Sequence, residues 1–264
     1  IHIHIEMILQ IMKKFILLMI VVFTLSVFSF SNPIGIIGAM DKEVEGLKNE
    51  MKVREITRIA GIDFYEGTLQ GKEIVLLKSG VGKVNSAMAT DILIREFGAV
   101  QIIFTGVAGA VNDKLNVGDV VISTELVEHD FDTTAFGEKL GNVPGSDNGK
   151  FYADSKLISL AEASAQKVLG KNHVFKGVIA TGDQFIADKE KVKFLEKEFG
   201  AWAVEMEGAS VAHVATLHAS EFVVIRAISD KADGSAHVTY EEFSTKAAEN
   251  SIKIVNEMLK KMKN

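Results

Sequence analysis

The sequence predicts an α/β fold in which helices cover both faces of a mixed central β-sheet. From Ile34 onward, short apolar runs alternate with longer stretches of helical periodicity, a pattern typical of a sheet packed between helices. Several of the runs consist mainly of Ile and Val, as expected for strands that are covered on both faces. No linker or repeat interrupts residues 32–264, so we expect them to form a single domain.

The apolar runs predict eight strands in order along the chain. Gln70-Gly71-Lys72 lies between the second and third runs and predicts a hairpin there. The expected strands cover residues 34–37, 64–69, 74–78, 102–105, 120–123, 178–180, 203–206 and 223–227.

Helical periodicity predicts six helices between these strands. In the last, Ala248, Ile252, Val255 and Leu259 recur at helical spacing. The expected helices cover residues 42–51, 85–97, 155–169, 189–198, 208–218 and 239–262. Residues 134–150 contain four glycines and Pro144 with little periodicity. We expect this long irregular segment to be a lid, an interface element or disordered.

The N-terminal residues 1–31 predict an extension followed by a secretory signal peptide. Lys13 and Lys14 precede an apolar run over residues 15–30, and Ser29-Phe30-Ser31 then supplies small residues. We expect cleavage after Ser31 and a periplasmic, secreted or cell-surface location. An uncleaved signal would instead anchor the chain in a membrane, and a non-functional signal would leave it cytoplasmic.

Composition excludes several classes of function. The net charge of -6 argues against a nucleic-acid partner, because binding to phosphates requires a basic face. The absence of cysteine removes disulfides, thiolate metal sites and a cysteine nucleophile. His129, Asp130 and Asp132 lack further histidines at ligand spacing, so we expect neither a metal nor another cofactor.

Ligands of open α/β sheets bind beyond the carboxyl ends of the strands, so we examined the residues that follow each apolar run. Glu43 falls in the first turn of the helix after the first strand, where an acidic residue can simply complement the helix dipole. The segments 79–83 and 105–109 each contain two glycines, which let the backbone approach a ligand. Neither segment is a P-loop or a complete dinucleotide fingerprint.

The run Ala203-Val204-Glu205-Met206-Glu207-Gly208 carries two carboxylates two positions apart. On a strand, Glu205 and Glu207 would share one face, which is unusual for a buried strand without a ligand or partner. They could also lie at an exposed strand end. Asp230 follows the last strand, where burial would raise its pKa and suit a general acid, although a helix N-cap is the alternative. Phe185 could stack on a flat ring or belong to the core.

Four motifs in one order closely resemble the 5′-methylthioadenosine/S-adenosylhomocysteine nucleosidases of the nucleoside phosphorylase superfamily. The resemblance covers essentially all of residues 34–264. The motifs are Ile34-Gly35-Ile36-Ile37-Gly38-Ala39-Met40, Leu77-Lys78-Ser79-Gly80-Val81-Gly82-Lys83-Val84, Val204-Glu205-Met206-Glu207 and Arg226-Ala227-Ile228-Ser229-Asp230.

The resemblance implies a nucleoside-phosphorylase-like domain that hydrolyses the N-glycosidic bond of 5′-methylthioadenosine, S-adenosylhomocysteine and also 5′-deoxyadenosine. Asp230 resembles the general acid that protonates adenine N7, and Glu43 resembles the base that activates water. An acid and a base on opposite sides of the broken bond parallel the inverting glycosidases. Glu207 resembles the ligand of the ribose hydroxyls, supported by Glu205.

The same resemblance assigns the walls of the site and a partner. Phe185 would stack on adenine, and the backbone of Ile186 would read the edge of the base. Phe136 and Pro144 of the irregular loop would reach the neighbouring subunit's pocket for the 5′-substituent, which implies a homodimer. The other expected substrate-binding residues are Met40, Val81, Ala108, Gly109, Met206, Arg226 and Phe243. Val107 and Glu138 stand where familiar members carry Ser and an aromatic residue.

Two other functions compete with hydrolysis. A nucleoside phosphorylase of the same superfamily would need a cationic cradle for phosphate, and Glu43 would repel that ion. A non-catalytic exported nucleoside-binding protein or adhesin would need neither a general acid nor a water activator. The presence of Glu43, Glu207 and Asp230 together therefore favours a hydrolase.

Overall fold

The computed structural model describes residues 12–14, 32–233 and 236–262. The chain divides into two units, Ile1–Ser31 and Asn32–Asn264, and each is described by itself. In the first unit residues 12–14 are helical, while the apolar run of the expected signal peptide and the cleavage position Ser31 lie outside the described residues. Within the described ranges, no helix combines the length and the apolar character that a membrane span requires.

In the second unit, the described residues form one mixed sheet of ten strands. The strands run in the order β10-β6-β8-β9-β5-β1-β4-β3-β2, with β7 beside β6. Because β10 also pairs with β5, five strands close into a ring, and β1, β4, β3 and β2 extend from it as an open wing. The strands are β1 (Ile34–Gly38), β2 (Lys52–Ile59), β3 (Ile62–Leu69), β4 (Lys72–Lys78), β5 (Gln101–Ala110), β6 (Val120–Glu128), β7 (Phe151–Tyr152), β8 (Val174–Thr181), β9 (Ala201–Glu205) and β10 (Glu221–Asp230).

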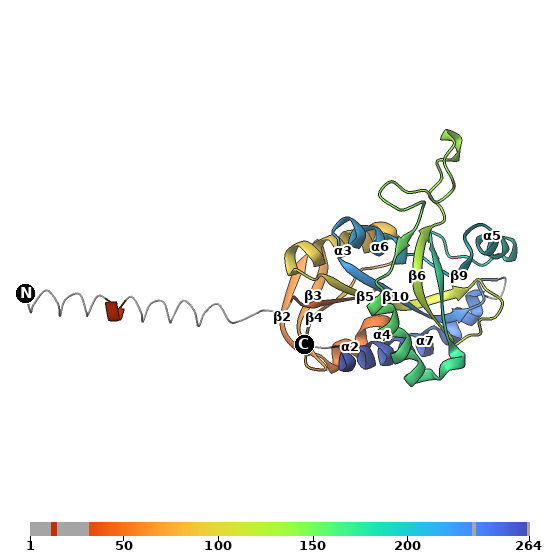
Figure 1. The fold of residues 1–264 in the computed structure, drawn as a ribbon. Coiled ribbons are helices and arrows are strands. Elements are labelled where there is room, and N and C mark those ends of the chain that lie inside the picture. Colours follow the sequence, from red (N-terminus) through yellow and green to blue (C-terminus); the bar gives the residue numbers. More distant parts are fainter. Residues whose placement is uncertain (1–11, 15–31, 234–235, 263–264) are drawn as a thin grey trace, which may run out of the picture. The chain divides into compact units, whose positions relative to one another are not determined.

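Helices cover both faces of this sheet, which confirms the predicted fold class. Helices α3 and α6 pack against each other on one side, and α2, α4 and α7 lie on the other (Figure 1). The helices are α2 (Asp41–Glu50), α3 (Lys83–Phe97), α4 (Ser155–Leu169), α5 (Lys189–Phe199), α6 (Gly208–Leu217) and α7 (Ala236–Lys261), with the short 3-10 helices η1 (Thr134–Phe136) and η2 (Lys171–His173).

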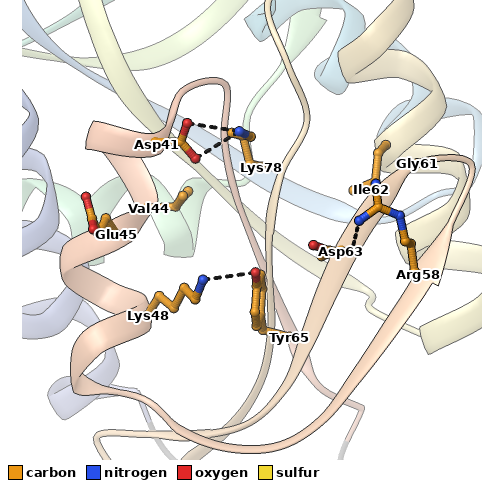
Figure 2. Close-up of a pocket in the computed structure, with 10 residues that line it drawn as sticks. All are labelled: Asp41, Val44, Glu45, Lys48, Arg58, Gly61, Ile62, Asp63, Tyr65 and Lys78. Atoms are coloured by element: carbon orange, nitrogen blue, oxygen red, sulfur yellow. Dashed lines mark hydrogen bonds and ion pairs between the residues drawn. The ribbon is translucent and has the colours of Figure 1, made fainter.

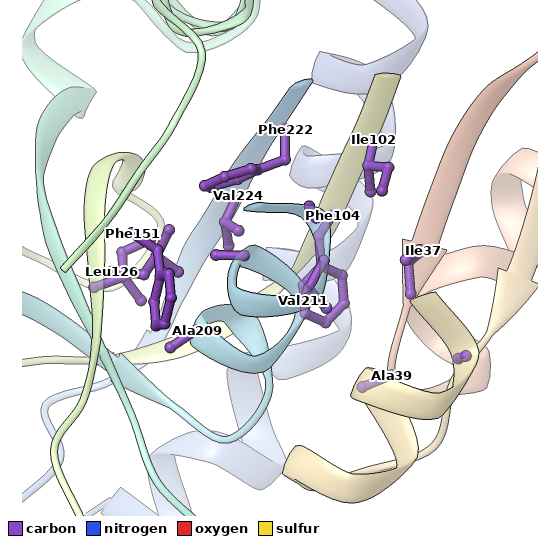
Figure 3. Close-up of a cluster of buried hydrophobic side chains, with 14 of the residues drawn as sticks. Ile37, Ala39, Ile102, Phe104, Leu126, Phe151, Ala209, Val211, Phe222 and Val224 are labelled. Carbon is purple, nitrogen blue, oxygen red and sulfur yellow. The ribbon is translucent and has the colours of Figure 1, made fainter. Parts of the chain in front are cut away.

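The side chains of adjacent residues on the central strands pack in different hydrophobic clusters. Ile37 joins the cluster beneath α6, together with Phe104 and Val211 (Figure 3). Its neighbour Ile36 points the other way and packs in the cluster that includes Leu259 of α7. This alternation explains the continuous apolar runs, because both faces of the central strands are buried.

The hairpin predicted at Gln70-Gly71 is present between β3 and β4. Leu69 pairs with Lys72, and the two intervening residues have φ values of 51° and 76°, which are typical of a tight two-residue turn. A second hairpin of the same kind joins β2 to β3 and was not predicted. Strand β2 is an edge strand that is mostly exposed, so it carries no apolar run for periodicity to detect.

The strand predicted over residues 102–105 is longer than expected, because β5 continues to Ala110. Gly106 therefore lies inside a strand and not in a turn. A Cβ atom on Gly106 would lie 1.9 Å from Nη1 of Arg226, so this glycine allows a close approach of that side chain. Strand β10 is also longer than predicted, and Asp230 is its last residue.

The predicted irregular segment over residues 134–150 is largely without helix or strand. It contains η1 and an isolated bridge between Asp147 and Lys150. The segment projects away from the sheet between β6 and β7 (Figure 1).

Candidate active site

A cavity of about 230 Å³ lies where β1, β5, β9 and β10 end or continue into loops. We call it the acid cavity, because Glu43, Glu207 and Asp230 all line it. Its lining residues are Ala39, Met40, Glu43, Val81, Val107, Ala108, Gly109, Phe185, Val204, Glu205, Met206, Glu207, Ser229, Asp230 and Tyr240. Three acids that are far apart in the sequence therefore meet around one small space, as the resemblance implies for a nucleosidase.

Glu43 caps the N-terminus of helix α2 and also lines the acid cavity. Its Oε2 accepts hydrogen bonds from the backbone N–H groups of Ala39 (2.7 Å) and Met40 (2.9 Å), and its Oε1 accepts one from Val107 (3.1 Å). Burial raises the pKa of this carboxyl, against the lowering effects of Arg226 and these three donors. Glu43 therefore has both functions that the sequence left open: it stabilises the start of α2, and it lines the acid cavity.

Arg226 is fully buried beneath the acid cavity. Its guanidinium lies 4.1 Å from the centre of the Phe104 ring and forms an ion pair with Glu205. The Oε2 atom of Glu207 lies 3.6 Å from the same guanidinium. Glu43 also interacts electrostatically with Arg226, so three carboxyl groups surround one cation and outnumber it.

The two neighbouring glutamates have different surroundings. Glu205 is the last residue of β9 and accepts hydrogen bonds from Thr181, Arg226 and the backbone N–H of Gly208. Glu207 lies beyond the strand, at the start of α6, and accepts one hydrogen bond from the N–H of Gly82 (2.9 Å). Glu205 is thus held by the protein, while Glu207 keeps lone pairs for a ligand.

Burial and the charge of Glu205 raise the pKa of Glu207 to about 7, despite the opposing effect of Arg226. A carboxyl with this pKa exchanges its proton near neutral pH. Perturbed carboxyls of this kind cluster at functional sites.

Asp230 lies on the wall shared by the acid cavity and a small lobe of about 30 Å³. Its Oδ1 accepts a hydrogen bond from the N–H of Ala232, and its Oδ2 accepts one from the hydroxyl of Ser229, each at 2.8 Å. Burial raises the pKa of Asp230 although these two bonds favour the ionised form. A raised pKa helps the carboxyl keep a proton to donate.

Two aromatic side chains, Phe185 and Tyr240, line the acid cavity. Phe185 lies on both the cavity and the small lobe, and Ile186 lines the lobe. Tyr240 of α7 meets the Phe185 ring edge-on, with 5.7 Å between centroids. Phe243, which was expected in the wall, is not among the residues that line the cavity, and Tyr240 lies there one helical turn earlier.

Sequence reasoning also missed the roles of Gly106 and Ser229. The sequence indicated only that Gly106 could let the backbone approach a ligand, and its contact with Arg226 becomes visible only when β5 and β10 are paired. Ser229 adjoins Asp230 in the quoted motif and could have been noted there, since a hydroxyl beside a carboxyl is a natural hydrogen-bond partner.

The remaining expected residues lie elsewhere. Phe136 and Pro144 line a separate cavity of about 440 Å³ in the projecting loop, together with Glu138. Within the described ranges, no three acidic or histidine side chains converge as metal ligands, and we assign none. Asp130, considered above for a metal, forms an ion pair with Lys83 instead.

Another cavity, of about 400 Å³, lies between α2 and the β2–β3 hairpin (Figure 2). We call it the polar cavity. Four of its charged side chains form two ion pairs: Lys78 lies 2.8 Å from Asp41, and Arg58 lies 3.1 Å from Asp63. Because these pairs are balanced and partly exposed, the polar cavity is the weaker candidate for chemistry.

The sequence model of the phosphorylase superfamily matches residues 33–260, which defines the class of this protein. The nucleosidase from Anoxybacillus flavithermus, named 5′-methylthioadenosine/S-adenosylhomocysteine nucleosidase, is 47% identical over 230 residues, covering 87% of this chain and 98% of that protein. The chain belongs to this nucleosidase family within the phosphorylase superfamily, as its motifs predicted.

Solved structures agree with this assignment. The nucleosidase from Neisseria meningitidis in complex with methylthio-immucillin-A has a TM-score of 0.84 and 42% identity, covering 88% of this chain and 100% of that one. Futalosine hydrolase of Helicobacter pylori has a TM-score of 0.82 and 37% identity, covering 88% of this chain and 98% of that one.

Proposed function

We propose that this chain hydrolyses the N-glycosidic bond of 5′-methylthioadenosine and S-adenosylhomocysteine, and of 5′-deoxyadenosine, releasing adenine and the corresponding ribose. The observation that carries the proposal is the convergence of Glu43, Glu207 and Asp230 on one buried cavity. Membership of the nucleosidase family supports the choice of substrates.

In the proposed reaction, Asp230 donates a proton to N7 of adenine, which makes the base a better leaving group. The C1′–N9 bond breaks with its electron pair going to adenine, and the sugar develops the charge of an oxocarbenium ion. Glu43 takes a proton from the water whose oxygen attacks C1′. The excess of carboxylates around Arg226 stabilises the positive charge on the sugar.

Other residues that line the cavity would bind the ribose and the adenine base. Glu207 accepts hydrogen bonds from the ribose 2′ and 3′ hydroxyls through its unoccupied lone pairs. Met206 packs against the ribose. Phe185 stacks on adenine, with its orientation supported by the edge-on contact with Tyr240.

The charge of the acid cavity argues against a phosphorylase. Arg226 pairs with Glu205 and does not line the cavity, so an incoming phosphate would meet the carboxyl groups of the wall instead of a cationic cradle. The test is adenine release by the full chain in phosphate-free buffer, with the sugar product identified by mass. We expect free sugar and no acceleration by phosphate. Strict dependence on phosphate would overturn hydrolysis, and binding without turnover would favour a nucleoside-binding protein.

We also propose a homodimer, in which the projecting loop reaches the neighbouring subunit. Large apolar side chains stand exposed on the loop and on α3, with Phe136 at 87% and Val84 at 78% exposure. Large exposed apolar patches mark interaction surfaces, and the proposed dimer would bury these two side chains. Light scattering should give twice the mass of one chain, and a monomer at micromolar concentration would contradict the proposal.

We further propose that the N-terminal signal directs export. The proposal depends on the order of Lys13, Lys14, the apolar run over residues 15–30 and the small residues that follow it. N-terminal sequencing of the natural protein should begin at Asn32. A protein that retains residues 15–31 in the cytoplasm would contradict export.

A further inference from the structure

Lys83, the first residue of α3, forms two ion pairs that the reaction above does not use. Its Nζ lies 2.6 Å from Oδ1 of Asp130 and 3.1 Å from Oε2 of Glu128. Burial disfavours the charged ammonium, but the two carboxylates prevail and raise the pKa of Lys83. None of these three side chains lines the acid cavity or its lobe.

A closed ring of contacts connects Lys83 to the segment after β8. The second oxygen of Asp130 accepts a hydrogen bond from the backbone N–H of Asp183 (2.9 Å). The side chain of Asp183 accepts one in turn from the backbone N–H of Lys83 (2.8 Å). Lys83 and Asp183 are therefore joined twice, once directly and once through Asp130.

The chain segments next to Lys83 and next to Asp183 both form part of the wall of the acid cavity. Gly82, which precedes Lys83, donates its N–H to Glu207, and Val81 before it lines the cavity. Phe185 follows Asp183 by two positions and lines the cavity and its lobe. The ring thus connects the side of the cavity assigned to ribose with the side assigned to adenine.

We propose that Lys83 is a positioning residue that holds segment 183–186, which binds the base, in register with Glu207, which binds the ribose. The inference rests on the proposed function, because it assumes that the cavity holds both halves of a nucleoside. Lys83 touches neither half. Its loss should therefore weaken binding and leave the proton transfer from Asp230 intact.

The test compares the full chain with Lys83→Met, Lys83→Arg and the control Lys48→Met. Lys48 is also paired, through the hydroxyl of Tyr65 (3.0 Å), but it faces the polar cavity. We expect Lys83→Met to raise KM for 5′-methylthioadenosine by about 10- to 100-fold, the factor that corresponds to the loss of charge-assisted hydrogen bonds from this network. The value of kcat and its pH profile should stay nearly unchanged. Lys83→Arg should recover most of the affinity, and Lys48→Met should behave as wild type.

Asp183→Ala opens the same ring from its exposed side and tests the inference even if Lys83→Met fails to fold. It should also raise KM, and the double variant should be no worse than the more severe single variant, because both changes break one network. An unchanged KM in either single variant, additive effects, or a lower kcat with a shifted pH profile would overturn the positioning role.

Wild-type chain that releases no adenine would overturn the proposed function instead. In that case calorimetric titration with adenine decides the inference separately, because Lys83→Met must still weaken adenine binding relative to wild type.

Discussion

The two cavities beside α2 differ in a way that identifies the site of chemistry. The polar cavity is the larger, at about 400 Å³ against about 230 Å³ for the acid cavity, and it is rich in charged side chains (Figure 2). Its ion pairs are exposed, however, with side-chain exposures of 46% and 79% for Lys78 and Asp41. In the acid cavity Arg226 and Glu205 form their ion pair at 0% and 3% exposure.

Burial and an unequal number of acidic and basic groups therefore mark the acid cavity, and not the larger polar cavity, as the site of chemistry. Water screens the balanced pairs of the polar cavity, so they contribute little energy. In the acid cavity several carboxylates share one guanidinium away from water, and the pKa values of Glu43, Glu207 and Asp230 are all raised. Unfavourable charge of this kind is retained where a reaction uses it.

Asp230→Asn should give the largest effect and is the strongest test of this comparison. The amide cannot donate an acidic proton to adenine, so we expect kcat to fall by about 10²- to 10⁴-fold. The measurement is adenine release under saturating substrate. Asp63→Asn, in the polar cavity, is the matched control and should leave kcat unchanged. Equal turnover in Asp230→Asn and wild type would refute the assignment of the acid.

Arg226→Met should destabilise the fold by about 3–5 kcal/mol, because it leaves buried carboxylates without their cation. Arg58→Met removes a guanidinium from the exposed pair of the polar cavity and should cost about 1 kcal/mol or less. Urea unfolding of both variants at one pH measures the difference. Similar losses of unfolding free energy in the two variants would show that the buried ion pair contributes no more to stability than the exposed one.

Glu207→Gln should make the stability of the protein less dependent on pH. The pKa of Glu207 is about 7 in the folded chain and 4.5 without the fold, so the folded state binds more protons between these values and loses stability as the pH rises. At about 1.4 kcal/mol per pKa unit, wild type should lose about 3 kcal/mol of stability relative to the variant between pH 4.5 and pH 8. Urea unfolding from pH 4.5 to 8 checks this. A difference that stays constant with pH would contradict it.

Asp41→Asn should have the smallest effect, although Asp41 lies two positions before Glu43. It weakens an exposed ion pair with Lys78, so we expect a change in unfolding free energy of about 1 kcal/mol or less. Adenine release should stay at the wild-type rate. A large loss of activity would show that the polar cavity acts on the reaction through α2.

The fold was predictable wherever the signal is local. Both faces of the central strands are buried, so their apolar runs marked them directly, and α4 was predicted over the residues that form it. Strand β2 escaped prediction because an edge strand is exposed and needs no apolar pattern. The length of β5 was underestimated because a glycine usually indicates a turn, whereas Gly106 makes room for Arg226.

For the site, the sequence alone supplied the identities of the acids and their positions close to strand ends. Those properties are visible because each motif is contiguous and follows a strand whose carboxyl end meets the others at one edge. Tertiary structure decided which glutamate keeps free lone pairs, that Tyr240 lines the cavity where Phe243 was expected, and that Lys83 joins two of its walls. Hydrogen bonds, burial and shared charge depend on side chains distant in the chain, so spacing along the sequence does not encode them.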